Sequence, residues 1–217
     1  RMRPLTLYKP KPLLEVGGKA LIVWHIEKLK QIGVTDIVIN SAWLADVLIG
    51  ALGDGSQFGV TIRWTREDKG LETAGGIINA LPLLGDEPFI LVNGDVWTTF
   101  DFSPLLDIKL NDDLAHLVFV SNPEQHPNGD FILANGRAYI FEQEQQGENL
   151  TFSGVSVIHP RLFDGLEEGK RPLAPLLKQG MLDGKISAEK MQSAWVDVGT
   201  PERLMALDLQ IRQGHYA

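Results

Sequence analysis

The chain has 217 residues, of which 44% are apolar and 22% charged, and its formal net charge at pH 7 is −8. This length supports a core large enough to fold without disulfides or a structural metal. The sequence contains no cysteine, which excludes disulfide scaffolds, thiolate zinc sites and cysteine nucleophiles. We expect a cytoplasmic protein; the sequence leaves the oligomeric state open, with a monomer slightly favoured. The acidic balance argues against nucleic-acid binding, and no apolar run is long enough to cross a membrane.

The predicted elements of the first half alternate between helices and strands. Apolar residues at helical spacing predict helices over 21–32, 42–52 and 73–84. Short β-branched runs predict strands over 36–40, 60–64 and 88–93. This order is typical of βαβ units. We therefore expect an α/β, Rossmann-like fold with a mixed, mostly parallel sheet flanked by helices.

In the second half, helices and strands alternate less regularly. Strands are predicted over 114–120 and 150–158, and the turn Asn135-Gly136 predicts a hairpin of 131–133 with 138–141. A helix over 173–182, a strand over 194–198 and a helix over 201–212 with proline at its first position follow. Because no linker or repeat interrupts the pattern, we expect a single domain over 1–217.

Two aspartates lie at the ends of predicted strands. Asp95 follows the strand over 88–93 after one glycine, and Asp197 lies near the end of the strand over 194–198. In open α/β sheets, ligands bind outside the carboxyl ends of the strands. Asp95 and Asp197 are therefore candidate ligands for one Mg²⁺, which binds few carboxylates and leaves room for phosphate oxygens. Alternatively, each aspartate caps a turn.

The first 19 residues concentrate positive charge, with five Lys or Arg and one Glu. Lys11 lies between Pro10 and Pro12, which predicts an extended, non-helical backbone. A lysine on such a stiff segment is suited to binding a phosphate as a point charge. The alternative is a solvated surface lysine.

The segment 70–76, with the sequence GLETAGG, precedes and enters a predicted helix. Its glycines would let a ligand approach the backbone, and its polar residues could read the edge of a base. Alternatively, Thr73 caps the helix and Gly75 and Gly76 pack tightly. The chain has neither a dinucleotide nor a phosphate-loop glycine motif, and no serine-hydrolase elbow. We expect His25 and His116 to be structural.

Three segments, in this order, resemble the sugar-1-phosphate nucleotidyltransferases. They are RMRPLTLYKPKPLL at 1–14, LVNGD at 91–95 and WVDVGTP at 195–201. The similarity extends over essentially the whole chain. The family signature begins with a small-residue strand and a Gly-x-Gly loop, whereas this sequence starts at the arginine that follows them, so we expect that strand and loop to be lacking.

The resemblance implies a reaction. The phosphate of a sugar 1-phosphate would attack the α-phosphorus of a nucleoside triphosphate, and pyrophosphate would leave. Segments 71–76, 88–98 and 151–156 are most similar to members that transfer UMP from UTP to N-acetylmuramic acid 1-phosphate in peptidoglycan recycling. The alternatives are guanylyl or thymidylyl transfer to mannose or glucose 1-phosphate, and a catalytically silent ligand-binding homologue.

The resemblance also implies roles for individual residues. Arg1 would stabilise the leaving pyrophosphate, Lys11 would bridge phosphates of both reactants, and the metal ligands would be Asp95 and Asp197. The candidate nucleotide-binding residues are Glu67, Glu72, Thr73 and Gly75, at the uracil edge, and Asn93, near the ribose or the sugar. The candidate sugar-binding residues are Gly129, Asp130, Glu142 and Ser153.

Overall fold

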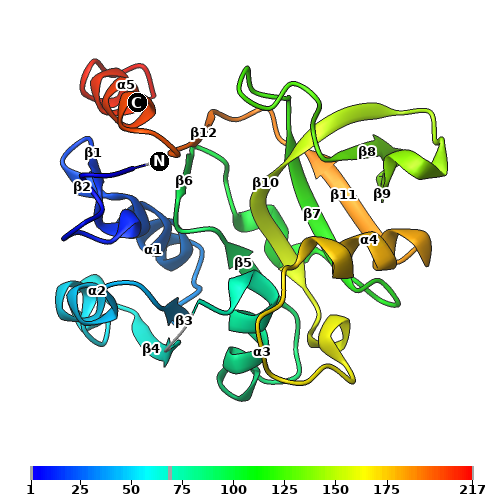
Figure 1. Ribbon diagram of the computed structural model, residues 1–217, viewed down its shortest axis with the longest axis horizontal. Helices are drawn as coiled ribbons and strands as arrows, with labels where there is room; N and C mark the ends of the chain where they lie inside the picture. Colours follow the sequence, from blue (N-terminus) through cyan, green and yellow to red (C-terminus); the bar gives the residue numbers. More distant parts are fainter. Residues whose placement is uncertain (1, 68–69, 217) are drawn as a thin grey trace. The chain divides into compact units, whose positions relative to one another are not determined.

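The structure is a computed structural model that describes residues 2–67 and 70–216 (Figure 1). The chain forms two compact units, each assembled from separate stretches of sequence. The first unit comprises residues 1–70, 93–103 and 193–217, and the second comprises residues 71–92 and 104–192. The chain therefore leaves the first unit and returns to it twice.

The first unit contains three pairs of strands and three helices. Strands β3 and β4 are parallel, whereas β1 pairs with β2 and β6 pairs with β12 in antiparallel ladders. A 3₁₀ helix over Lys11–Leu13 precedes β1, and another covers Ser56–Phe58. The elements are β1 (Glu15–Val16), β2 (Lys19–Ala20), α1 (Leu21–Gln31), β3 (Asp36–Ser41), α2 (Ala45–Leu52), β4 (Thr61–Arg66), β6 (Val96–Thr98), β12 (Trp195–Asp197) and α5 (Pro201–Arg212).

The second unit is built on one six-stranded sheet with the strand order β5-β10-β7-β11-β9-β8. Strands β7 and β11 are parallel, and the other ladders of this sheet are antiparallel. Short 3₁₀ helices cover Ser103–Asp107, Phe141–Gln143 and Pro160–Phe163. The elements are α3 (Glu72–Leu84), β5 (Phe89–Val92), β7 (Ala115–Val120), β8 (Phe131–Ala134), β9 (Arg137–Tyr139), β10 (Glu148–Ile158), α4 (Ala174–Leu182) and β11 (Ile186–Lys190).

The predicted α/β class with a mixed sheet is confirmed, and each predicted helix and strand is present within a few residues of its expected bounds. The hairpin turn has the left-handed φ values, 50° at Asn135 and 73° at Gly136, that its sequence predicts. Parallel pairing is less frequent than expected, because the β8–β9 hairpin and the long strand β10 form antiparallel ladders. That residues 1–217 form one nucleotidyltransferase domain stays a prediction.

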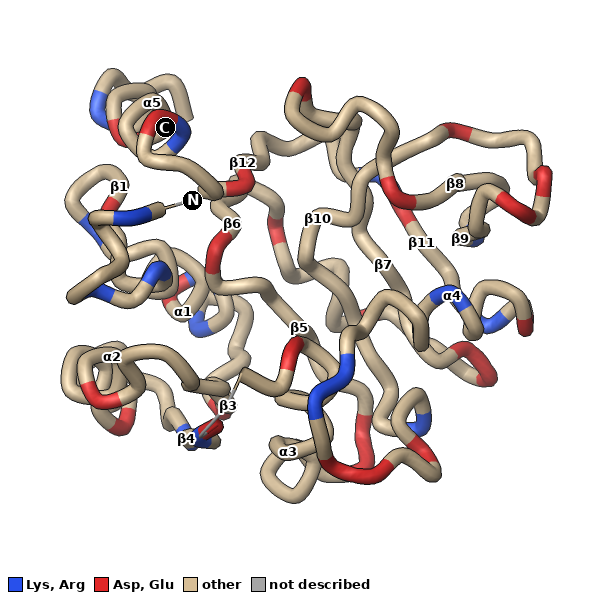
Figure 2. The backbone as a smooth tube through the Cα atoms, in the orientation of Figure 1, with Lys and Arg blue, Asp and Glu red and all other residues tan. Residues whose placement is uncertain are grey.

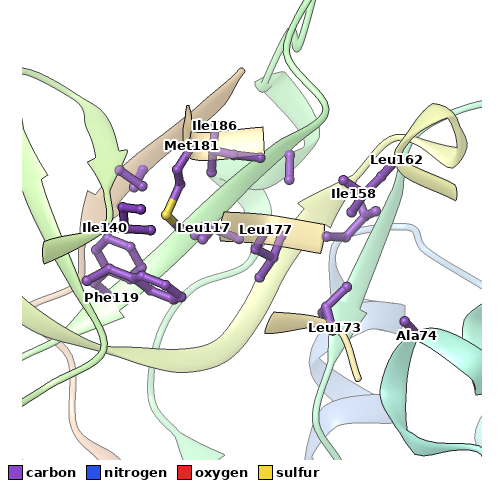
Figure 3. Packing of buried hydrophobic residues seen from close by; sticks show 14 of the residues in the cluster. Ala74, Leu117, Phe119, Ile140, Ile158, Leu162, Leu173, Leu177, Met181 and Ile186 are labelled. Atoms are coloured by element: carbon purple, nitrogen blue, oxygen red, sulfur yellow. The ribbon is translucent and has the colours of Figure 1, made fainter. Parts of the chain in front are cut away.

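The core of the second unit lies where α3 and α4 pack on the sheet (Figure 3). Ala74 and Ile77 come from α3, and Leu177 and Met181 come from α4. They meet strand residues such as Leu117, which is fully buried. Burying one such aliphatic side chain stabilises the fold by about 1.5–3 kcal/mol. The core therefore fixes the strands that carry the candidate residues of this unit.

The first unit has two apolar clusters. In one, Ile22 and Ile26 of α1 pack against Leu48 and Leu52 of α2 and Ile62 of β4. The other surrounds Trp97 of β6 and includes Val16, Leu21, Val198 and Leu207. Because Val198 follows Asp197 and Trp97 lies two residues after Asp95, this cluster anchors the backbone near both carboxylates.

Candidate active site

The structure places Asp95 directly before β6 and Asp197 at the end of its partner strand β12. Strands β6 and β12 pair so that Val96 lies opposite Asp197, and the Val198 N–H donates to the backbone carbonyl of Asp95 at 3.1 Å. Figure 2 shows acidic positions beside both strands. The two aspartates, about a hundred residues apart in the sequence, are thus held by one short ladder.

Each of these carboxylates has a cation beside it. Lys11 Nζ lies 2.8 Å from Asp95 Oδ2, and Arg203 Nη2 lies 3.4 Å from Asp197 Oδ2. The side chains of Asp95 and Asp197 remain 44% and 33% exposed. Both carboxylates can therefore be reached by a ligand while a positive charge balances each one.

The predicted backbone of Lys11 was wrong in part. Pro10 is extended, as expected, but Lys11 begins a single 3₁₀ turn over Lys11–Leu13. Proline is tolerated in the first turn of a helix because the N–H it lacks would have no intrahelical partner there. The turn buries Leu13 and places Lys11 beside Asp95, so the alternative of a purely solvated lysine does not hold.

Helix α1 supports β6 from inside the first unit. The buried ring of His25 bonds through Nε2 to the Val96 carbonyl at 2.8 Å, and Lys28 Nζ donates to the Thr98 carbonyl at 2.9 Å. Desolvation by burial lowers the pKa of His25 to about 4 and that of Lys28 to about 8. The expectation that His25 is structural is confirmed, and His116 is likewise buried, against Ser187.

The depressed pKa of His25 gives a pH-dependent stability. Between pH 6.5 and about 4 the unfolded chain binds a proton at His25 that the folded chain does not, so stability falls as the pH falls through this window. The loss attributable to His25 reaches about 3 kcal/mol at the lower end. Urea unfolding as a function of pH measures it. We expect His25→Gln to flatten this slope and the exposed His215→Gln to leave it unchanged; equal slopes in both variants would contradict the assignment.

The nucleotide-binding candidates belong to both units. Glu67 follows β4, with its N–H bonded to the Ser41 carbonyl at 2.9 Å, and Asn93 follows β5 at the start of the turn into β6; both lie in the first unit. Glu72 and Thr73 are exposed at the start of α3 in the second unit. The alternative cap at Thr73 was wrong, because α3 begins at Glu72 and its N-terminal flank is Leu71, with no side-chain cap.

Gly75 packs against its own unit. Its N–H donates to the Arg171 carbonyl at 3.0 Å, and a Cβ at this position would lie 2.3 Å from the Gly169 carbonyl oxygen. The face of Gly75 that was expected to admit a base is thus filled by residues 169–171. Gly75 therefore lets this segment approach α3, as the tight-packing alternative predicts, and its contact with a base stays a prediction. Nearby, Lys170 Nζ lies 3.3 Å from the Glu72 carboxylate.

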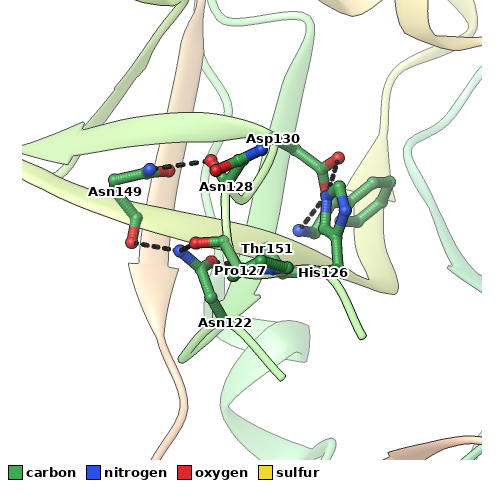
Figure 4. A network of polar contacts seen from close by, with 8 residues as sticks. Asn122, His126, Pro127, Asn128, Asp130, Asn149 and Thr151 are labelled. Atoms are coloured by element: carbon green, nitrogen blue, oxygen red, sulfur yellow. Dashed lines mark hydrogen bonds and ion pairs between the residues drawn. The ribbon is translucent and has the colours of Figure 1, made fainter. Parts of the chain in front are cut away.

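A polar network surrounds Asp130, one of the sugar-binding candidates (Figure 4). Its Oδ2 accepts from the Phe152 N–H at 2.8 Å, and its Oδ1 lies 2.9 Å from His126 Nε2. The side chains of Asn122 and Asn149 bridge the same loop to β10. Asp130 therefore uses both carboxylate oxygens to hold the loop over 122–130 on β10, so it shapes this loop.

Ser153 does not line a surface. Its side chain is fully buried, and its hydroxyl donates to the Val118 carbonyl at 2.6 Å and accepts from the Val155 N–H at 3.1 Å. It thus closes the irregularity in β10 between Phe152 and Val155. Ser153 therefore shapes β10, and its direct contact with a sugar stays a prediction. Glu142 is exposed, and the register of the β8–β9 hairpin puts it at the same end as Gly129.

Gly129 has a left-handed φ of 61°, and a Cβ there would lie 2.3 Å from Asn149 Oδ1 and 2.8 Å from the Leu150 carbonyl oxygen. Gly136 has a φ of 73° with open space around it. We expect Gly136→Ala to cost about 1–2 kcal/mol of stability from backbone strain. Gly129→Ala should cost about 1–3 kcal/mol more, because it also overpacks. Chemical denaturation of both variants tests this expectation, and equal losses would show that the packing around Gly129 is loose.

Arg1 lies outside the described residues. Sequence reasoning missed Arg203, His25 and Lys28 as partners of the two aspartate-bearing strands. Of these, only Arg203 could have been suspected from the sequence. It lies in the first turn of a predicted helix, where a positive charge is unfavourable unless an acidic group compensates it. In residues 2–67 and 70–216 no helix is long and apolar enough to span a bilayer.

Comparison with known proteins identifies the family of the chain. Residues 1–135 match the nucleotidyl transferase family. An N-acetylmuramate alpha-1-phosphate uridylyltransferase of Neisseria meningitidis is 49% identical over 94% of this chain and 90% of its own length. The enzyme of the same name from Caulobacter vibrioides is 30% identical over 98% of this chain and 93% of its own length.

Two further proteins are similar to this chain at lower sequence identity. A mannose-1-phosphate guanylyltransferase catalytic subunit beta of Dictyostelium discoideum is 28% identical over 95% of this chain and 60% of its own length. The crystal structure of a Bacillus anthracis protein provisionally assigned as a glucose-1-phosphate thymidylyltransferase has a TM-score of 0.84 and 21% identity, over 97% of this chain and 90% of that one. At that identity the structure shows the shared fold alone. By the family match and the Neisseria relative together, this chain belongs to the nucleotidyl transferase family.

Proposed function

We propose that this protein transfers UMP from UTP to N-acetylmuramic acid 1-phosphate and releases pyrophosphate, as a cytoplasmic step of peptidoglycan recycling. The observation that carries the proposal is the pairing of β6 with β12. Asp95 lies in the turn directly before β6, Asp197 ends β12, and Lys11 Nζ lies 2.8 Å from Asp95 Oδ2. The names of the Neisseria and Caulobacter relatives support the choice of substrates.

The residues present fit Mg²⁺ as the cofactor. Carboxylates are hard oxygen ligands, and Mg²⁺ in phosphate-transfer sites is held by one or two of them and completed by phosphate oxygens and water. Asp95 and Asp197 would hold the ion, which when bound would neutralise charge on the reacting phosphates.

The rest of the chemistry needs positioning more than proton transfer. The phosphate of a sugar 1-phosphate is already an anion, so no general base is required. Catalysis then depends on alignment and on cations placed near the developing charge. Among the described residues, we assign this role to Lys11. Its ammonium pairs with Asp95 in this structure and can bind a phosphate oxygen instead. Arg1 stays our proposed partner of the leaving pyrophosphate.

We propose direct substrate contacts for candidate residues in both units. Within the first unit, Glu67 and Asn93 stay proposed nucleotide contacts. Within the second unit, Glu72 and Thr73 are exposed at the start of α3 and stay proposed from the resemblance. For the sugar, the backbone of Gly129 and the exposed carboxylate of Glu142 are the proposed contacts. Asp130 and Ser153 act by shaping the loop and strand beside them.

The test is an assay of the full-length natural protein against a matrix of four nucleoside triphosphates and N-acetylmuramic acid, glucose and mannose 1-phosphates, read by pyrophosphate release with Mg²⁺. We expect UTP with N-acetylmuramic acid 1-phosphate to give the highest kcat/KM. Preference for GTP with mannose 1-phosphate would support the alternative favoured by the Dictyostelium relative. No turnover with any pair would favour a silent binding homologue and overturn the proposal.

A further inference from the structure

We infer that Arg203 is a positioning residue, which fixes the orientation of the Asp197 carboxylate for the metal. The inference rests on the proposed function only in taking Asp197 as a metal ligand. The contact that motivates it is the 3.4 Å approach of Arg203 Nη2 to Asp197 Oδ2. The side chains of Arg203 and Asp197 are 22% and 33% exposed, so solvent screens this contact only in part.

The start of α5 places Arg203 for this contact. Thr200 caps the helix, with its hydroxyl oxygen accepting from the Arg203 N–H at 3.3 Å, and Pro201 occupies the first helical position. The chain therefore turns between Asp197 and Arg203, and the side chain of Arg203 contacts that aspartate. The Thr200 cap and Pro201 fix the backbone at the start of α5, which fixes the direction from which the arginine approaches.

Gly199 provides the room for the guanidinium. A Cβ at this position would lie 2.0 Å from Arg203 Nη2 and 3.2 Å from Asp197 Oδ2. The backbone of Gly199 also turns tightly, with its N–H donating to the Asp197 carbonyl at 3.0 Å. The guanidinium therefore occupies the space that any other residue at 199 would fill with its own side chain.

The charge of Arg203 is otherwise poorly placed. A cation in the first turn of a helix faces the positive end of the helix dipole, and Arg203 Nε is buried with no acceptor among the described residues. Both features disfavour an arginine here unless acidic groups balance its charge. Glu202 lies in the same turn, and the Asp197 carboxylate is the one in ion-pair contact with the guanidinium.

Two physical effects of Arg203 on a metal at Asp197 oppose each other. Its positive charge repels the cation, which weakens binding, whereas its fixed contact pre-orients the ligand, which strengthens binding. Residues that orient metal ligands typically change metal affinity by about 10–100-fold. We expect orientation to dominate, so that loss of the arginine weakens binding even though it removes a positive charge.

The test is a titration of the protein with Mn²⁺ alone, in which electron paramagnetic resonance counts the free ion. We expect Arg203→Ala to raise the Kd for Mn²⁺ about 10-fold, and Arg203→Lys to recover part of the loss. Gly199→Ala keeps the charge but displaces the guanidinium, and it should weaken binding similarly. In the double variant the two losses should not add, because they break the same contact.

The matched control is Arg212→Ala at the other end of α5. It removes an arginine–aspartate pair of the same helix, Arg212 Nε to Asp208 Oδ2 at 2.8 Å, and should leave the Kd unchanged. Melting temperatures without metal confirm that each variant is folded.

The outcomes separate the inference from the proposed function. Unchanged or tighter Mn²⁺ binding in Arg203→Ala and Gly199→Ala would overturn the inference, as would a wild-type protein that binds no Mn²⁺. Wild-type turnover in the substrate matrix would leave the proposed function standing in that case. Conversely, an inactive wild type whose Mn²⁺ affinity still drops in both variants would support the role of Arg203 and contradict the proposed reaction.

Discussion

Replacing Asp95 or Asp197 by asparagine is expected to lower kcat for nucleotidyl transfer by about 10²–10³-fold. Asparagine keeps the shape of the side chain but removes the negative charge that would hold the cation, and it leaves Lys11 or Arg203 without its 2.8 Å or 3.4 Å acidic partner. Pyrophosphate release under saturating substrates and varied Mg²⁺ measures the loss. Because both residues would serve one ion, the double variant should lose little more than either single variant.

Asp36→Asn is the matched control for these variants. Asp36 on β3 forms an ion pair with Arg63 on β4 at 2.9 Å in the same unit, and it has no place in the proposed chemistry. Its turnover should be that of the wild type. Near-normal turnover of Asp95→Asn or Asp197→Asn, in protein with an unchanged circular dichroism spectrum, would refute the metal assignment.

Replacing Phe119 by alanine is expected to destabilise the protein by about 3–5 kcal/mol. Phe119 is fully buried on β7, between β10 and β11, and its ring stacks on Phe131 with centroids 6.0 Å apart. The truncation loses apolar burial and leaves a cavity in a close-packed core. Urea unfolding followed by fluorescence and circular dichroism measures the loss.

Phe141→Ala is the corresponding control, because Phe141 is 43% exposed. It should cost less than about 1 kcal/mol, as surface substitutions usually do. Similar losses in the two variants would mean that the core of the second unit tolerates the cavity, contrary to the packing shown in Figure 3.

Periodic elements were the most predictable part of the fold. Helix α1 and strand β10 are long and strongly patterned, and their sequences predict them within two residues. Strand β6 has only three residues, and β11 mixes Ser, Glu and Lys with its apolar positions, so neither carries a local signal. Such short or polar strands form because neighbouring strands pair with them. The identity of those partners cannot be read from the few residues of the strand itself.

The sequence could suggest candidate site residues but not their surroundings. The rule that ligands bind at strand ends predicts Asp95 and Asp197 as metal ligands, and that role stays a prediction; in the structure Asp95 precedes β6 and Asp197 ends its partner strand β12. The partners of these residues were not predictable, since Lys11 and Asp95 are 84 residues apart. The packing of Ser153 and Gly75 likewise depends on residues distant in the sequence. Ser153 is buried and donates to the Val118 carbonyl, and Gly75 packs against residues 169–171.

The interleaving of the two units has a consequence for the order of assembly. The second unit contains all the strands of its sheet once Lys190 has been synthesised, but β6 gains its partner only when β12, Trp195–Asp197, has left the ribosome. The loop that separates the two paired strands spans nearly a hundred residues, and most of it belongs to the other unit. Folding of that intervening sequence shortens the effective loop and lowers its closure entropy. The aspartate pair is thus a late-forming feature, set in place by the prior folding of the sequence between its two halves.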